Sequence, residues 1–118
     1  MRDALIVALG GAVGSVARWL VGQALGGAVR ALPWGTLAVN LAGSAGAGVV
    51  AGVRPGGLLT ALLAVGFLGA FTTASTLVAE LSEQARSSVR AAAALLALHV
   101  GPGLLLAGAG LALGRALG

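Results

Sequence analysis

Long apolar runs separated by short polar breaks are the main pattern of this chain. Four such segments run from about residues 4 to 25, 34 to 53, 58 to 81 and 89 to 113. Each is close to the roughly 20 residues that an α-helix needs to cross about 30 Å of hydrocarbon. The breaks contain the glycines, prolines and polar residues that separate helices: GGAVRALP, RPGG and SEQARSSVR. The pattern predicts an all-α membrane protein, with one four-span transmembrane domain over residues 1–118.

Composition strengthens this prediction and excludes several classes of function. Of the 118 residues 58% are hydrophobic and 8% are charged, whereas an ordinary soluble domain has roughly 25% charged residues. The mean hydropathy is +1.05. The chain has no cysteine, which excludes disulfides, thiolate metal sites and cysteine nucleophiles. Its basic residues stand singly at the ends of apolar runs, so no basic patch indicates a nucleic-acid partner. We expect a multi-pass protein of the cell inner (plasma) membrane.

The arginines are balanced between the two sides of the membrane. Flanking arginines favour the cytoplasmic side, and with four spans three fall on each side: Arg2, Arg54 and Arg115 against Arg30, Arg86 and Arg90. Such a balance predicts dual topology, with insertion in both orientations and assembly as an antiparallel dimer. The alternative interpretation is that six charges are too few to carry a topological signal.

The third segment contains a predicted helix break, within the stretch GFLGAFTTAST. Gly66 and Gly69 precede the adjacent Thr72 and Thr73. Glycine is conformationally permissive and threonine bonds back to the preceding turn, so we expect a break between residues 69 and 73. Irregular backbone at membrane depth is tolerated only against protein or a watery cavity, and its freed carbonyls can hold a small cation. The third helix is therefore expected to be broken near its middle.

Polar side chains lie beyond this break and in the other spans. Ser75 and Thr76 are expected to line a narrow polar track, because hydroxyl and amide donors can replace the water shell of a small anion. The amide of Asn40 offers two N–H donors for an anion or for an interhelical hydrogen bond. Arg18 either reaches the interface or makes a positive aqueous mouth that favours anions. Glu80 is expected to reach water at the end of the third span.

Two further features have ordinary structural interpretations. His99 stands alone in the fourth span, which gives little support to a proton relay or a metal site. Small residues recur at four-residue spacing, as in Gly10 with Gly14 and Gly110 with Gly114. In lipid, such spacing allows the backbones of neighbouring helices to approach closely. We therefore interpret most of the 21 glycines as helix-packing positions.

Three motifs together resemble the Fluc (CrcB) family of fluoride channels. They are GGAVGSVARW at residues 10–19, PWGTLAVNLAGS at 33–44 and GFLGAFTTAST at 66–76, in the family's order and spacing. With the four-span layout, the resemblance covers nearly the whole chain. It implies an antiparallel dual-topology homodimer that passes fluoride passively out of the cell through two pores at the subunit interface, and so confers fluoride resistance.

The resemblance also implies roles for particular residues. The fluoride pore would contain Asn40, Ser75 and Thr76, and the vestibule residues would be Arg18 and Glu80. A structural sodium ion would lie on the two-fold axis of the dimer, held by the backbone carbonyls of Gly69 and Thr72. Sodium is thus the one cofactor that the resemblance implies.

The chain departs from the family pattern in the pore itself. After the paired threonines the family has Phe-Ser-Thr-Phe, with phenylalanine edges that contact fluoride, but this chain has Ala74 and Leu77 at the two phenylalanine positions. Phe67 and Phe71 precede the break and do not replace them in register. In the fourth helix, His99 and Gly103 stand where the family tends to have a polar or aromatic residue and a serine.

Several functions remain open at this point. The homodimer conducts through a modified pore, or the chain is the pore-degenerate subunit of a heterodimeric channel whose partner chain is a paralogous subunit. A small multidrug-resistance transporter has similar length and topology but needs a carboxylate deep in the first helix, and Asp3 lies only at its entrance. A non-conducting scaffold gives no reason for Asn40 and Ser75. An enzyme is least supported, because no nucleophile, base and orienting group occur together.

Overall fold

The computed structural model describes residues 1–25 and 33–118. Its elements, in chain order, are α1 (Arg2–Ala24), α2 (Trp34–Val53), α3 (Gly57–Thr60), the π-helix η2 (Ala61–Leu68), α4 (Gly69–Phe71), α5 (Ser75–Ser87) and α6 (Val89–Leu117). The third apolar segment comprises α3 to α5. Within the described ranges, four helical runs are long and apolar enough to cross a membrane, which confirms the predicted four spans.

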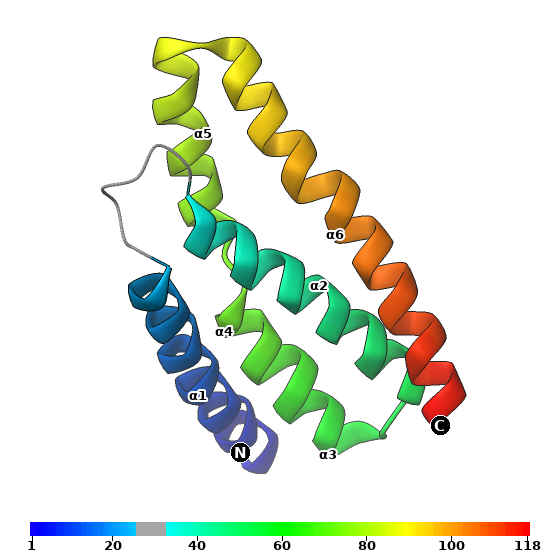
Figure 1. Ribbon diagram of the computed structural model, residues 1–118. Coiled ribbons are helices and arrows are strands. Elements are labelled where there is room, and N and C mark those ends of the chain that lie inside the picture. Colours follow the sequence, from blue (N-terminus) through cyan, green and yellow to red (C-terminus); the bar gives the residue numbers. More distant parts are fainter. Residues whose placement is uncertain (26–32) are drawn as a thin grey trace.

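The helices form two closely packed pairs joined by the broken third span (Figure 1). One pair is α2 with α6, which run side by side in the same direction. The other is α1 with η2 and α4. The third span begins against α1, passes the break, and continues as α5, which meets α6 at a sharp corner at Ser88. The break therefore lies in the middle of the molecule, between the two packed pairs.

Glycines bring the backbones of α2 and α6 together. A Cβ on Gly48 would overlap the carbonyl oxygen of Ala107, and a Cβ on Gly110 would overlap that of Ala45. Gly114 meets the backbone of Val49 in the same way. The predicted packing role of the small residues in these two helices is confirmed.

Glycines also bring the backbones of α1 and the third span together. A Cβ on Gly10 would lie 2.9 Å from the backbone nitrogen of Phe67, and a Cβ on Gly66 would lie 2.7 Å from the carbonyl oxygen of Val7. Gly14 meets the backbone of Phe67 one turn further along α1. Because there is no net hydrophobic drive between helices in lipid, this close approach is a main source of their association.

Apart from Arg18, the described arginines lie near the two ends of the molecule, as the span assignment predicts. Both termini and the turn between α2 and α3 are at one end, and the corner between α5 and α6 is at the other (Figure 1). The first end therefore carries Arg2, Arg54 and Arg115, and the second carries Arg86 and Arg90. Arg30, which completes the predicted balance, lies outside the described residues.

The third span is interrupted at the end of the predicted window. The chain stays helical through Phe71, and Thr72 then adopts an extended conformation with φ −76° and ψ 159°. Helix α5 begins at Ser75, so residues 72–74 form the break. The predicted helix break is confirmed, although residues 69–71, which we also assigned to it, are helical.

The helix before the break is not an ordinary α-helix. Residues Ala61–Leu68 form a π-helix, in which each N–H bonds to the carbonyl five residues earlier. This wider helix places Leu62, Gly66 and Phe67 against the backbone of α1. Such turns occur frequently at functional sites. The widened helix leads directly into the break.

Candidate functional site

The side-chain amide of Asn40 forms hydrogen bonds to the backbone of the break in the third span. Its Nδ2 donates to the carbonyl oxygen of Thr73 at 3.0 Å, and its Oδ1 accepts from the backbone N–H of Thr73 at 2.9 Å. Both backbone groups of Thr73 are thus satisfied by one side chain from α2. A buried backbone group without a partner is costly, so this pair of bonds stabilises the irregular conformation. It also leaves one N–H of Asn40 free of these contacts.

The hydroxyl of Thr73 organises the start of α5. It donates to the Thr76 hydroxyl at 3.0 Å, and it accepts from the backbone N–H of Thr76 at 3.3 Å. The latter bond has the three-residue spacing of a helix N-cap. The Ser75 hydroxyl lies 3.3 Å from that of Thr73. Thr73 is buried, whereas Ser75 and Thr76 are exposed on the surface of the single chain.

The predicted pore residues are therefore brought together. Asn40 and Thr76 both contact Thr73, one from α2 and the other from the start of α5. The Thr76 hydroxyl accepts from Thr73, which leaves its own hydrogen available for a ligand. The site offers a half-buried amide and exposed hydroxyls, all of them uncharged. Such groups can replace water around a small anion without neutralising it.

Two backbone carbonyls lose their helical partners at the break. In a regular helix the carbonyl of Gly69 would accept from the N–H of Thr73, and that of Thr72 would accept from the N–H of Thr76. In the structure those N–H groups donate instead to the side chains of Asn40 and Thr73. Gly69 is exposed and has little around it, with the Ala64 carbonyl 3.8 Å from the position of a Cβ. Carbonyls of this kind are suited to a hard monovalent cation.

Glu80 lies one to two turns further along α5 and faces protein. Its Oε1 accepts a hydrogen bond from the hydroxyl of Thr36, which is 9% exposed. The other carboxylate oxygen, Oε2, is buried and has no hydrogen-bond partner among the described residues. Our expectation that Glu80 reaches water is wrong for the single chain. The spacing of α5 instead directs the carboxylate toward the first turn of α2.

Not all the predicted site residues lie beside Asn40 and Thr73. Arg18 lies on α1, is partly exposed, and makes no side-chain hydrogen bond or ion pair within the described part of the chain. Ala74 is exposed within the break, and Leu77 is partly buried in the first turn of α5. The rings of Phe67 and Phe71 stack on each other with their centroids 5.5 Å apart, before the break. They belong to the packing against α1 and α2.

His99 lies on α6 and is one of the buried residues of that helix. It is 7% exposed, and its Nδ1 lies 3.0 Å from the carbonyl oxygen of Leu95. Its Nε2 is buried without a partner among the described residues. Among residues 1–25 and 33–118, no group of three or more His, Cys, Asp or Glu side chains could bind a metal ion.

Sequence reasoning missed the importance of two threonines. Thr73 was assigned only to the break, although the Thr73-x-x-Thr76 spacing is that of an N-cap. Thr36 was not singled out, although it precedes Asn40 by four residues and therefore lies on the same face of α2. The polar face of α2 thus begins at Thr36 and continues through Asn40.

Comparisons with known proteins give consistent matches over nearly the whole chain. The model of the family described as CrcB-like protein, Camphor Resistance (CrcB), matches residues 5–111. A protein of Symbiobacterium thermophilum named fluoride-specific ion channel FluC 1 is 48% identical, with 93% of this chain and 95% of the relative covered. Proteins named fluoride-specific ion channel FluC from Rhodospirillum centenum and Rhizobium etli are each 44% identical over 99% of this chain, and cover 95% and 99% of their own lengths.

Proposed function

This chain belongs to the CrcB family, and from that premise we propose that it is a fluoride-selective channel through which fluoride leaves the cell passively. Relatives that align over nearly the whole chain are named as ion channels, so the family is not one of enzymes. The observation that carries the proposal is the amide of Asn40 locked onto the broken third span beside free hydroxyl groups. This arrangement is a set of positioned, neutral donors at membrane depth.

In the proposed path, fluoride exchanges water for side-chain donors one at a time. The second N–H of Asn40 and the hydroxyl hydrogen of Thr76 are the donors that the internal hydrogen bonds leave available. Ser75 adds a hydroxyl at the same level. Arg18 would attract the anion electrostatically from α1, and Glu80 would border the vestibule. A neutral path allows the ion to leave as well as enter, because binding is favourable but weak.

The same region supports assembly as an antiparallel homodimer. Ser75, Thr76 and Gly69 are exposed on the single chain at membrane depth. Polar groups and irregular backbone do not face lipid, because unsatisfied groups cost several kcal/mol in hydrocarbon. A second copy of this chain would cover them and enclose a pore between the subunits. The balanced arginines support opposite orientations for the two copies.

A structural sodium ion fits the freed carbonyls of Gly69 and Thr72. The structure diverts the N–H partners of both carbonyls, and Gly69 is exposed on the surface of the single chain. These two residues of each subunit would hold the ion on the two-fold axis. When bound, sodium would supply a fixed positive charge that links the two broken helices.

Ala74 and Leu77 distinguish two versions of this function. Neither side chain offers the aromatic edge found at the corresponding family positions. The homodimer therefore conducts through hydroxyl and amide donors alone, or the chain pairs with a subunit that supplies the aromatics. We favour the self-sufficient homodimer, because the Asn40 and Thr73 network is complete within one chain.

Fluoride efflux from liposomes that contain only this purified chain tests the proposal. A fluoride electrode follows the efflux, and chloride-loaded liposomes provide the selectivity control. Fluoride-selective efflux is the expected result. Absence of efflux from a monodisperse dimer would contradict the self-sufficient channel. Restoration of efflux by the double variant Ala74→Phe, Leu77→Phe, or by co-expression with a relative that has both phenylalanines, would then identify a pore-degenerate subunit.

A further inference from the structure

Two buried polar atoms among the described residues have no hydrogen-bond partner. They are Oε2 of Glu80 on α5 and Nε2 of His99 on α6. Buried polar side-chain atoms are nearly always satisfied, because leaving one unpaired costs free energy. Two such atoms on adjacent helices therefore indicate a ligand that the described residues of one chain do not supply.

The two atoms lie in the same part of the molecule. Glu80 is tied to α2 by the hydroxyl of Thr36. On α6, a Cβ at Gly103 would lie 3.5 Å from the Ser44 hydroxyl, and His99 is one turn before Gly103. Because α2 and α6 run in the same direction, His99 lies at the level of α2 one turn before Ser44. On α2, this level is one helical turn after Thr36.

The direction of the histidine ring supports the same placement. Its Nδ1 reaches back to the carbonyl of Leu95, which lies one turn closer to the corner between α5 and α6. Glu80 and His99 approach this corner from opposite sides along the chain. They do not form an ion pair within 4.0 Å of each other in the described part of the chain.

The unpaired atoms have the same chemical character. If Nδ1 donates its hydrogen to the Leu95 carbonyl, the neutral imidazole leaves Nε2 as an acceptor. Oε2 of an ionised Glu80 is also an acceptor. Two acceptors require a donor, and the simplest donor available from water at the mouth of a channel is a proton, carried on the imidazole or through a bridging water.

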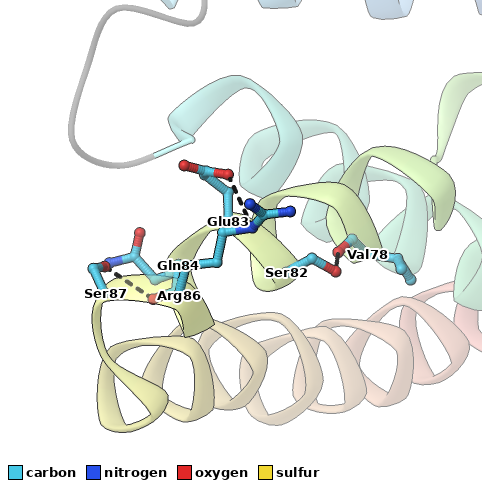
Figure 2. A network of polar contacts seen from close by, with 6 residues as sticks. All are labelled: Val78, Ser82, Glu83, Gln84, Arg86 and Ser87. Atoms are coloured by element: carbon cyan, nitrogen blue, oxygen red, sulfur yellow. Dashed lines mark hydrogen bonds and ion pairs between the residues drawn. The ribbon is translucent and has the colours of Figure 1, made fainter.

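Helices α2, α5 and α6 carry no other buried charged side chain beside the pair. Helix α2 has no titratable side chain. On α5, Glu83 and Arg86 have exposed side chains, and Nε of Arg86 lies 3.7 Å from Oε2 of Glu83 (Figure 2). On α6, Arg90 is exposed and precedes His99 by about 2.5 turns. Arg18 on α1 is partly exposed, and α2, α5 and α6 supply no buried opposite charge to the pair.

We propose that Thr36, Glu80 and His99 form a proton-binding cluster beside the ion path, and that fluoride flux rises when this cluster takes up a proton. The inference rests on the proposed function and adds its regulation. With Glu80 ionised and His99 neutral, the cluster carries one negative charge and repels an anion nearby. Proton uptake cancels that charge. Histidine is the side chain that most often exchanges a proton in the physiological pH range.

The test is fluoride efflux from proteoliposomes at a series of pH values between about 6 and 8, the range over which histidine ordinarily titrates. Protein-free liposomes at each pH measure the leak of hydrofluoric acid through bare lipid, which is subtracted. We expect the protein-dependent rate to rise as pH falls, on the order of tenfold for the loss of one nearby unit charge. A wild-type rate that is equal across this range would overturn the inference.

Three variants locate the effect. His99→Gln should remove most of the pH dependence. Glu80→Gln should raise flux at the alkaline end to near the level that wild type reaches at the acidic end. Glu83→Gln is the matched control, because it is an exposed glutamate of the same helix, and it should retain the wild-type profile.

The outcomes separate the two proposals. Absence of fluoride-selective efflux at every pH would contradict the channel itself, whereas efflux without pH dependence would overturn only the proton-binding cluster. A wild-type profile in His99→Gln would also overturn it. If His99→Gln does not give a monodisperse protein, Glu80→Gln decides: an unchanged rate at the alkaline end overturns the cluster, and a raised rate supports it.

Discussion

The interface between α2 and α6 and the segment from Thr72 to Glu80 are held in place by different forces. In the first, glycines such as Gly48 and Gly110 allow backbone to approach backbone, and no side-chain hydrogen bond between described residues crosses it. In the second, side-chain hydrogen bonds hold the segment: Asn40 and Thr36 of α2 bond to Thr73 and Glu80, and Thr73 bonds to Thr76.

The difference separates the closely packed part of the molecule from the part that we propose handles ions. Close helix packing in lipid depends on shape, and it offers nothing to a passing ion. Polar contacts at membrane depth are costly unless they are satisfied or used. The α2–α6 pair therefore serves as a scaffold, and the Asn40 and Thr73 network is the part with chemical capability. Substitutions in the two regions should fail in different ways.

The largest expected effect comes from filling the glycine interface. In Gly110→Val, the new Cβ would overlap the Ala45 carbonyl and lie 3.0 Å from the backbone nitrogen of Val49. Backbone cannot yield as a flexible side chain does, so the two helices must separate. We expect loss of monodisperse protein in detergent, measured by size-exclusion chromatography. Gly108→Val is the matched control, because nothing lies within 4 Å of its Cβ position. Equal behaviour of the two variants would contradict the packing role.

The next effect concerns Asn40. In Asn40→Asp, a carboxylate replaces the donor to the Thr73 carbonyl and adds a negative charge beside the proposed anion path. We expect fluoride flux to be abolished and the free energy of unfolding to fall by about 1–3 kcal/mol, since the Thr73 carbonyl loses its partner. Liposome efflux and thermal unfolding in detergent measure the two effects.

A neighbouring hydroxyl provides the control for Asn40. The Ser44 hydroxyl donates to the carbonyl of Asn40, within the same helix, and makes no hydrogen bond to the break. Ser44→Ala should therefore conduct nearly as wild type does. If Asn40→Asp conducts at the wild-type rate from an intact dimer, the amide is not part of the ion path.

The smallest effect is expected at Thr73. Thr73→Val removes the hydroxyl that accepts from the Thr76 backbone N–H and donates to its side chain. Loss of an N-cap hydroxyl typically costs about 1 kcal/mol, and we expect flux to fall a few-fold as the Thr76 hydroxyl loses its orientation. Thr73→Ser keeps the hydroxyl and should restore both properties. Thermal unfolding and efflux of the two variants, measured side by side, test this, and indistinguishable variants would argue against an orienting role.

The span layout was predictable because transfer into lipid dominates the free energy of each segment. The helix break was predictable in part, because Gly69, Thr72 and Thr73 weaken a continuous helix by local effects. The π-helical form of Ala61–Leu68 was not, since the letters ALLAVGFL suit an α-helix equally well. Its hydrogen-bond register accompanies a close approach of the α1 backbone, which the local sequence does not encode.

The site was predictable in its members more than in its contacts. The cost of a buried amide required that Asn40 face protein, but its partner Thr73 is 33 residues away. Glu80 looked like a residue at a span end, whereas its contact with Thr36 bridges 44 positions of the chain. The fluoride-binding and sodium-binding roles of the predicted residues stay predictions for the experiments above. Contacts over such separations depend on how whole helices are placed.

The amide of Asn40 also sets a limit on how this protein can diversify. Because α2 is fixed against α6 by backbone contact, and Asn40 fixes the break against α2, helix spacing positions each subunit's side of the proposed pore. A change of one pore side chain alters the lining at one level, whereas a change of helix spacing moves the backbone along the whole path. Selection for a larger ion would have to act first on the small residues between the helices, far from any atom that the ion touches.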